Sequence, residues 1–148
     1  MATISVQAED FDVGAEHAAV QSGNTAIGAI VTFTGTVRDI TGKLDSMTLE
    51  HYPGMTEKEL AHIAADAEAR WPLEGCRLIH RYGTLKPGDN IVLVITASSH
   101  RQAAFEAAEF LMDFLKSKAP FWKKETTDEG GEWVDAKEKD ETALKRWQ

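Results

Sequence analysis

Residues 91–118 read IVLVITASSHRQAAFEAAEFLMDFLKSK, a strand pattern followed at once by a helix pattern, and we expect the strand to be central in its sheet. Residues 91–97 are almost entirely apolar, which is typical of a strand that is covered on both faces inside a sheet. Ser99, with Gln102 three residues later, has the pattern of a capping box and predicts a helix over about residues 100–118. Apolar residues cover a wide face of this helix, so we expect it to be buried on more than one side.

Other segments also have the composition of strands. They are 3–8, 27–38, 47–52 and 76–83. The polar, glycine-containing loop 39–45 separates the second from the third, which predicts a hairpin. The turn Pro87-Gly88-Asp89 connects the fourth to the central strand 91–97.

A second helix is predicted after the break at Pro53-Gly54. Thr56, with Glu59 three residues later, has the pattern of a capping box, and apolar residues then follow at helical spacing. Pro72 ends this helix, because the residue before a proline disfavours helical backbone.

The C-terminal part of the chain is mixed in character. An apolar and basic stretch follows Pro120, and after it we expect a turn at Gly130-Gly131, a short strand around Trp133-Val134 and a charged tail. The order of all these elements predicts an α+β fold, a single domain over residues 1–148 with a largely antiparallel sheet and packed helices.

Composition excludes several classes of protein. Asp and Glu number 24 and Lys and Arg 16, so the 148-residue chain has a formal net charge of −8, which opposes binding to nucleic acid or to an anionic membrane. No apolar run approaches the roughly 18–20 residues that cross a bilayer, and no secretory signal is visible. The single cysteine, Cys76, leaves no internal disulfide. We therefore expect a soluble, cytoplasmic protein.

Basic residues are nevertheless concentrated in particular places. Residues 116–124 (KSKAPFWKK) hold four lysines and no acid, and Arg38 ends a predicted strand. His100 and Arg101 stand at the start of the long helix, where free backbone N–H groups favour an anion and cations oppose the helix dipole. These groups either bind a phosphate or carboxylate or are solvated cations, and the charge pattern alone leaves both interpretations open.

Other chemistries lack a supporting pattern. The five histidines show no metal-binding spacing, so no metal site is predicted. The chain has no GxSxG, Walker or GxGxxG motif, and Cys76 is expected to be a small buried residue. The lysines remain, since crowded and partly desolvated lysines can act as acids, bases or amine nucleophiles.

Long blocks of the chain resemble the large, catalytic subunit of molybdopterin synthase. The blocks are VTFTGTVR (31–38), LEHYPGMTEKEL (49–60), RWPL (70–73), HRYGTLKPGD (80–89), SSHRQAAFEA (98–107) and LKSKAPFWKKE (115–125). The resemblance covers nearly the whole chain and implies an α/β hammerhead-type fold. It also implies an enzyme, a sulfurtransferase that converts cyclic pyranopterin monophosphate into molybdopterin by inserting two dithiolene sulfurs.

The resemblance further implies the partners of such an enzyme. The sulfur arrives as a thiocarboxylate on the C-terminal Gly-Gly of a small ubiquitin-like sulfur-carrier subunit, and no cofactor is bound permanently. The large subunits form a homodimer at the centre of a heterotetramer. A chain with only Cys76 has no obvious sulfur relay of its own, which agrees with an external donor.

The resemblance also assigns the site residues. Lys116 matches the lysine that the family treats as most important for catalysis, and Lys123 matches the second. The substrate-binding positions are Thr36, Val37, Arg38, His100, Arg101, Lys116, Lys123, Lys124 and Glu125, and Phe33, Met112 and Lys137 are possible pocket-lining residues. Thr36 stands where many relatives carry lysine, and Lys137 stands where some carry arginine. A lysine in place of arginine keeps the charge but loses the bidentate contact to a phosphate.

The expected mechanism divides these residues by role. Arg38, His100, Arg101 and Lys123 hold the phosphate, while Lys116 moves protons during attack by the thiocarboxylate. In the related enzymes the pocket lies at the large-subunit dimer interface, which would let His100 and Arg101 serve the second subunit. The alternative is a non-catalytic anion-binding or sulfur-carrier-docking module of the same fold, against which the presence of both lysines argues.

Overall fold

The structure, a computed structural model, describes residues 2–127, 130–134 and 138–147. Its strands are β1 (Thr3–Gln7), β2 (Ala29–Thr36), β3 (Leu44–His51), β4 (Leu73–Arg81), β5 (Gly83–Leu85), β6 (Asn90–Ser98), β7 (Phe121–Thr127) and β8 (Gly130–Val134). Its helices are α1 (Val13–Gln21), α2 (Met55–Arg70), α3 (Arg101–Ser117) and α4 (Glu138–Lys145).

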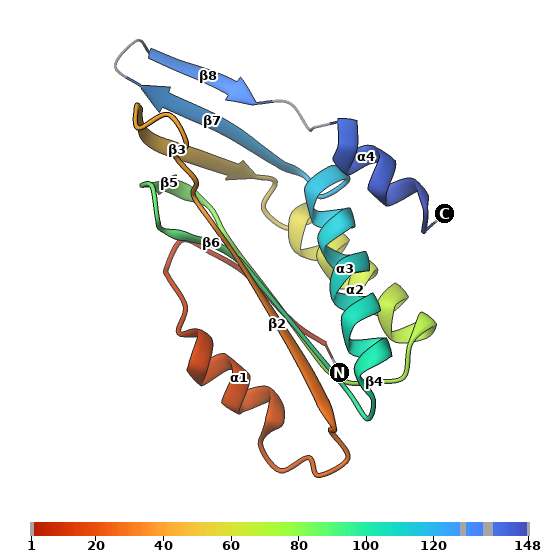
Figure 1. The fold of residues 1–148 in the computed structure, drawn as a ribbon. Helices are drawn as coiled ribbons and strands as arrows, with labels where there is room; N and C mark the ends of the chain where they lie inside the picture. Colours follow the sequence, from red (N-terminus) through yellow and green to blue (C-terminus); the bar gives the residue numbers. More distant parts are fainter. Residues whose placement is uncertain (1, 128–129, 135–137, 148) are drawn as a thin grey trace.

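The described strands form two four-stranded sheets (Figure 1). In the first sheet the order is β1-β4-β6-β2, with β1 parallel to β4 and the other pairs antiparallel. In the second sheet the order is β5-β3-β7-β8, and every pair is antiparallel. The predicted α+β class with mostly antiparallel strands is confirmed, but the strands are divided between two sheets instead of forming one.

The predicted hairpin between segments 27–38 and 47–52 is wrong. β2 pairs with β6, whereas β3 pairs with β5 and β7 in the other sheet. The cause lies just after β2, where the Val37 N–H donates to the Asp89 carbonyl at 2.9 Å and the Val37 carbonyl accepts from Gly88 N–H at 2.8 Å. Because the chain is tied there to the turn before β6, it continues into the second sheet and does not fold back on β2.

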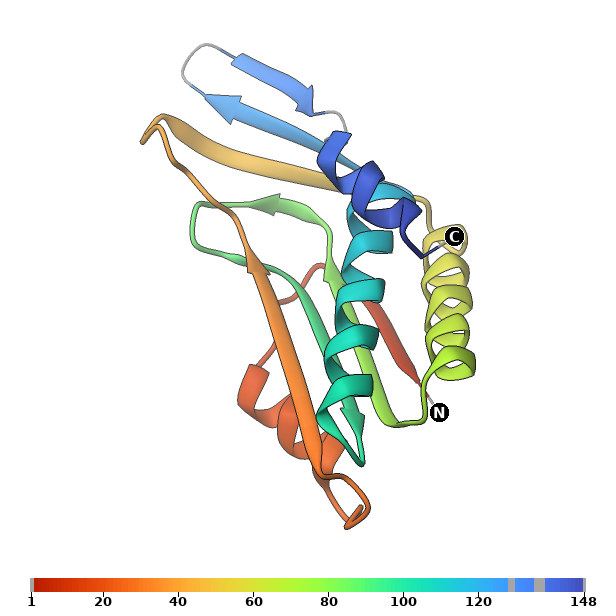
Figure 2. The same cartoon turned by 45° about the vertical axis from the view of Figure 1, so that its right-hand side comes forward.

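β6 is an interior strand of the first sheet, between β4 and β2, as predicted, and α3 packs on it. Val92 and Val94 of β6 belong to the apolar cluster beneath α2 and α3, while Leu93 and Ile95 belong to the cluster beneath α1. Figure 2 shows α1 on one face of the first sheet and α2 with α3 on the other. α3 also contacts both α2 and α4, which confirms its burial on more than one side.

Both predicted capping boxes are wrong. α3 has His100 at its N-cap with no side-chain cap, and Gln102 donates instead to Glu106 at 3.0 Å. α2 begins after Gly54, whose φ of 84° is a conformation that glycine adopts without strain.

Thr56, which was expected to cap α2, is instead buried within its first turn. Its hydroxyl accepts a hydrogen bond from Tyr52 N–H at 2.9 Å and donates one to the Pro120 carbonyl at 3.2 Å. This hydroxyl therefore connects the start of α2 to the residue that precedes β7.

The C-terminal part has more structure than its charge pattern indicated. Gly130 and Gly131, predicted as a turn, are the first residues of β8 and pair with Thr127 and Thr126. The expected charged tail contains helix α4, which contacts α3. Leu144 of α4 is buried, so packing against α3 supplies a reason for the helix that the charged sequence concealed.

Candidate active site

A pocket of about 630 Å³ lies where the two sheets meet the C-terminal end of α3. Its charged lining residues are Arg38, Lys116, Lys123, Glu125 and Asp140, and its apolar ones include Phe33, Met112 and Phe121. The volume falls within the range of small-molecule sites, and an apolar wall with a few convergent charges is the composition expected of such a site.

Lys116 and Lys123 reach the pocket from different elements. Lys116 lies in the last turn of α3, and Lys123 lies in β7 two residues after Phe121, on the same face of the strand. A tight connection joins the two elements, in which Lys118 N–H donates to the Phe114 carbonyl at 2.8 Å and Phe121 N–H to the Ala119 carbonyl at 2.8 Å. The short reversal brings the two lysines that the resemblance marked as catalytic to one cavity.

The end of β2 supplies another part of the pocket wall. The pairing register between β2 and β6 shifts between Gly35 and Thr36, and β2 ends at that point, so the strict alternation of its faces stops. Thr36 and Arg38 consequently line the pocket, whereas Val37 is 3% exposed and packs in the core between the sheets. The backbone groups of Val37 are also paired with the turn before β6, so this residue is part of the scaffold.

Two of the three possible pocket-lining residues are found in this pocket. Phe33 is 40% exposed and Met112 is half-buried against the main core, and both line the pocket. Glu125 lines it as well, on the same face of β7 as Lys123.

Other predicted site residues lie away from this pocket. Lys124 is on the opposite face of β7 from Lys123, and its ammonium is 5.8 Å from the centre of the Trp133 ring. His100 and Arg101 are at the far end of α3, about 22 Å from Lys116 at 1.5 Å per residue. Within one chain they therefore do not join the lysines. Lys137 lies outside the described residues.

The structure adds His80, which none of the sequence patterns had marked as a site residue. It lines the pocket, is 6% exposed, and its ring stacks on that of Phe121 with centroids 3.6 Å apart. Burial lowers the pKa of His80 to about 3, with further lowering by the positive charges of Lys123 and Lys116. The signal in the sequence is its spacing: His80 follows Cys76 and Leu78 at alternate positions of β4, and these positions share a buried face.

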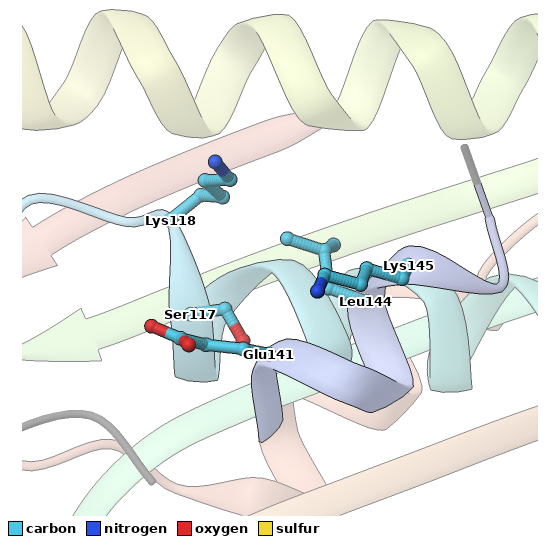
Figure 3. Close-up of a pocket in the computed structure, with 5 residues that line it drawn as sticks. All are labelled: Ser117, Lys118, Glu141, Leu144 and Lys145. Carbon is cyan, nitrogen blue, oxygen red and sulfur yellow. The ribbon is translucent and has the colours of Figure 1, made fainter. Parts of the chain in front are cut away.

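A smaller pocket of about 250 Å³ lies between the end of α3 and α4 (Figure 3). Its lining residues are Ser117, Lys118, Glu141, Leu144 and Lys145. None of these is a predicted site residue. Only Ser117 lines both pockets, so the smaller cavity does not extend the set of lysines that meet in the larger one.

Two observations limit the chemistry of this site. Within the part of the chain that the structure describes, no three His, Cys, Asp or Glu side chains form a group that could hold a metal ion. Cys76 is buried, and its burial raises the pKa of the thiol to about 12, so the thiolate that sulfur chemistry needs is disfavoured.

None of the described helices combines the length and the apolar composition needed to cross a membrane.

Comparison with known protein families bears directly on this lysine-lined pocket. The model of the MoaE protein family matches residues 6–118, which include β2, most of the first sheet and all of α3. The chain belongs to the MoaE family. As expected of a member, it is 58% identical over 147 residues to the molybdopterin synthase catalytic subunit of Mesorhizobium japonicum, a match that covers 98% of this chain and 92% of that protein.

Solved MoaE structures have the same fold. The molybdopterin biosynthesis MoaE protein from Burkholderia ambifaria is 55% identical with a TM-score of 0.86, and the match covers 99% of this chain and 98% of that one. The molybdopterin synthase structure from Staphylococcus aureus is 33% identical with a TM-score of 0.80, and it covers 88% of this chain and 96% of that one. The resemblance found in the sequence is therefore confirmed over nearly the full length of this MoaE chain.

Proposed function

We propose that this chain is the catalytic subunit of a molybdopterin synthase, an enzyme that inserts two dithiolene sulfurs into cyclic pyranopterin monophosphate. The observation that carries the proposal is the convergence of Lys116, Lys123 and Arg38 in one pocket. Membership of the MoaE family and the names of the curated relatives support the same reaction.

The pocket suits an anionic heterocycle. Arg38, Lys116 and Lys123 supply positive charge for the cyclic phosphate, and the guanidinium can form paired hydrogen bonds with phosphate oxygens. Phe33 and Met112 supply apolar surface for the ring system. In this arrangement Arg38 and Lys123 hold the phosphate, while Lys116 donates a proton to the phosphate-ring oxygen as that bond breaks.

The sulfur must come from another protein. Cys76 is buried and remains a thiol at neutral pH, so it offers no relay. A small ubiquitin-like subunit with a thiocarboxylate on its C-terminal Gly-Gly fits this requirement, because its thin tail can enter the pocket and its anionic end can meet Lys116 and Lys123. A structural relative from Helicobacter pylori was solved as a complex of subunits 1 and 2 of its molybdopterin-converting factor.

The position of His100 and Arg101 supports a homodimeric arrangement. They lie at the opposite end of α3 from Lys116, so they can share a phosphate site with such a lysine only if the lysine belongs to a second subunit. We propose that two copies of this chain pair at the centre of a heterotetramer in the cytoplasm, with each α3 N-terminus facing the other copy's lysines.

Product analysis tests the proposal. The chain is mixed with a thiocarboxylated small subunit and cyclic pyranopterin monophosphate, and the products are measured by mass spectrometry. We expect a pterin product whose mass and isotope pattern show two sulfur atoms that the precursor lacks. Binding of both components with no sulfur gained would instead support the alternative, a non-catalytic anion-binding or carrier-docking module.

A further inference from the structure

One buried titratable group in the pocket has no part in the proposed reaction. His80 sits on the buried face of β4, where the first sheet meets β7 of the second. Leu78, two residues earlier on the same strand face, is a core residue. Burying a histidine at the next position on this face costs free energy unless its ring nitrogens form hydrogen bonds.

The imidazole of His80 is held in one orientation. One face of the ring is stacked on Phe121 at an interplanar angle of 16°. Nδ1 lies 2.8 Å from the carbonyl oxygen of Arg81, and because a carbonyl only accepts, Nδ1 carries the hydrogen. Nε2 is then the unprotonated nitrogen, and it can act only as a hydrogen-bond acceptor.

The surroundings keep this ring neutral. Lys123, Lys116 and His51 are the titratable groups whose charges reach it, and each opposes a second proton on the ring. Burial acts in the same direction and is the larger effect on the pKa of His80. The imidazole therefore remains an acceptor throughout the physiological pH range.

Lys123 is the donor best placed to use this acceptor. It follows Phe121 by two residues on the same face of β7, a separation of about 7 Å along the strand, and Phe121 is in direct contact with the His80 ring. The carboxylates of Glu125 and Asp140 line the same pocket as acceptors, and Nε2 of the neutral His80 ring, which stacks on Phe121, is a further acceptor there.

We infer that His80 is a positioning residue for the proposed synthase reaction: its neutral imidazole accepts a hydrogen bond from the Lys123 ammonium through Nε2 and holds that lysine towards the substrate. A long side chain that is already oriented loses less entropy when the reacting groups come together. The inference rests on the proposed function for its kinetic consequence, but the hydrogen-bonding arrangement can be tested without it.

A matched pair of substitutions separates the acceptor from the ring. In His80→Asn the amide can still donate to the Arg81 carbonyl, but the acceptor at the Nε2 position is lost. His80→Gln places an amide oxygen near that position. We expect His80→Asn to lower kcat roughly ten- to a hundredfold with little change in KM, in line with a lost hydrogen bond to a charged group, and His80→Gln to recover part of the loss.

A double-mutant cycle shows whether His80 acts through Lys123. In a Lys123→Met background, His80→Asn should cost no further activity, because the lysine it positions is absent. A purely structural role predicts the same loss in both backgrounds and would overturn the inference. His51→Asn is the matched control, since His51 contacts Phe121 and Tyr82 but does not line the pocket, and its activity should stay near that of the unaltered chain.

The nitrogen chemical shifts of the His80 ring provide a test that needs no activity. At neutral pH we expect a protonated Nδ1 and an unprotonated Nε2, with the Nε2 signal moving when Lys123 is replaced by methionine. A ring protonated on Nε2, or an Nε2 signal unaffected by that substitution, would overturn the inference even if the chain proves to be a synthase. If the tautomer and the coupling are found but no sulfur is inserted, the proposed function fails alone.

Discussion

Trp147 donates a hydrogen bond of 2.6 Å from its indole Nε1 to the carboxylate of Asp113, 34 residues earlier in the chain. Arg146 donates to the same carboxylate at 2.9 Å, and the Trp147 ring packs edge-on against Trp71 and Phe110. Asp113, a residue of α3, thus holds the residues that follow α4 against α3. Since α4 carries Asp140 into the pocket lining, an anchor outside the pocket helps to shape it.

Replacing Asp113 with alanine tests this anchor. We expect a loss of about 1–3 kcal/mol of unfolding free energy, because the partly buried Trp147 N–H loses its acceptor, while Arg146 keeps its pairing with Glu109. KM for the pterin precursor should rise as the Asp140 wall loosens, and urea unfolding with steady-state kinetics measures both. Asp45→Ala, which removes an exposed carboxylate, is the control. Unchanged stability and KM in Asp113→Ala would contradict the anchoring role.

Lys116→Ala should abolish sulfur insertion while leaving the fold intact. A lysine in the last turn of a helix contributes at most about 1 kcal/mol through the helix dipole, so the loss of activity should far exceed the loss of stability. Product mass spectrometry and thermal unfolding measure the two effects. Lys118→Ala is the matched control, because Lys118 lines the smaller pocket and not the larger one. A folded Lys116→Ala chain with full activity would remove the proposed proton donor.

Arg101→Ala tests whether the pocket is completed by a second subunit. Alone, it should weaken precursor binding in calorimetry through loss of a charge-assisted contact, with little effect on stability. Mixed with Lys116→Ala chains, it should restore about a quarter of the normal activity, since random pairing gives half mixed dimers with one intact pocket of two. Mixtures that stay inactive, or precursor affinity that does not change, would contradict a site shared across the dimer.

Thr56→Val should destabilise the chain by about 1–3 kcal/mol, because it leaves the Tyr52 N–H and the Pro120 carbonyl without their shared hydroxyl. Thr56→Ser retains the hydroxyl and should lose clearly less. Urea unfolding of the two variants makes the comparison. A loss in Thr56→Ser as large as that in Thr56→Val would contradict the hydroxyl as the main connection between α2 and the residue before β7.

His80 should make the folded chain sensitive to acid. Its pKa is about 3 in the folded chain against 6.5 unfolded, so between these values the unfolded chain binds a proton that the folded chain does not. Stability due to this group is therefore full above pH 6.5 and falls by up to about 1.4 kcal/mol per pH unit towards pH 3. His80→Gln should flatten the dependence of unfolding free energy on pH over this range. If the unaltered chain and His80→Gln instead show the same dependence on pH, the histidine is not buried in its neutral form.

Much of this outcome could be predicted from local patterns. The apolar run at 91–97 placed a strand inside a sheet, and the wide apolar face of the next helix placed it in the core, because periodicity reports burial directly. The cluster of lysines at 116–124 also located one wall of the pocket. The predicted capping boxes are wrong because the sequence pattern describes only hydrogen bonds that are available locally. Thr56 instead donates a hydrogen bond to a carbonyl 64 residues away.

The sequence by itself determined which residues carry the charge and which segments are apolar, and it was enough to identify the family. Only the tertiary structure decided which of these residues meet. The register shift after Gly35 turns Thr36 and Arg38 to the pocket and Val37 to the core, and pairing across the sheets brings His80 beside Phe121. The same structure separates Arg101 from Lys116 by the length of a helix. The physical reason is that strand pairing and helix docking act between residues far apart in the chain, where local periodicity carries no information.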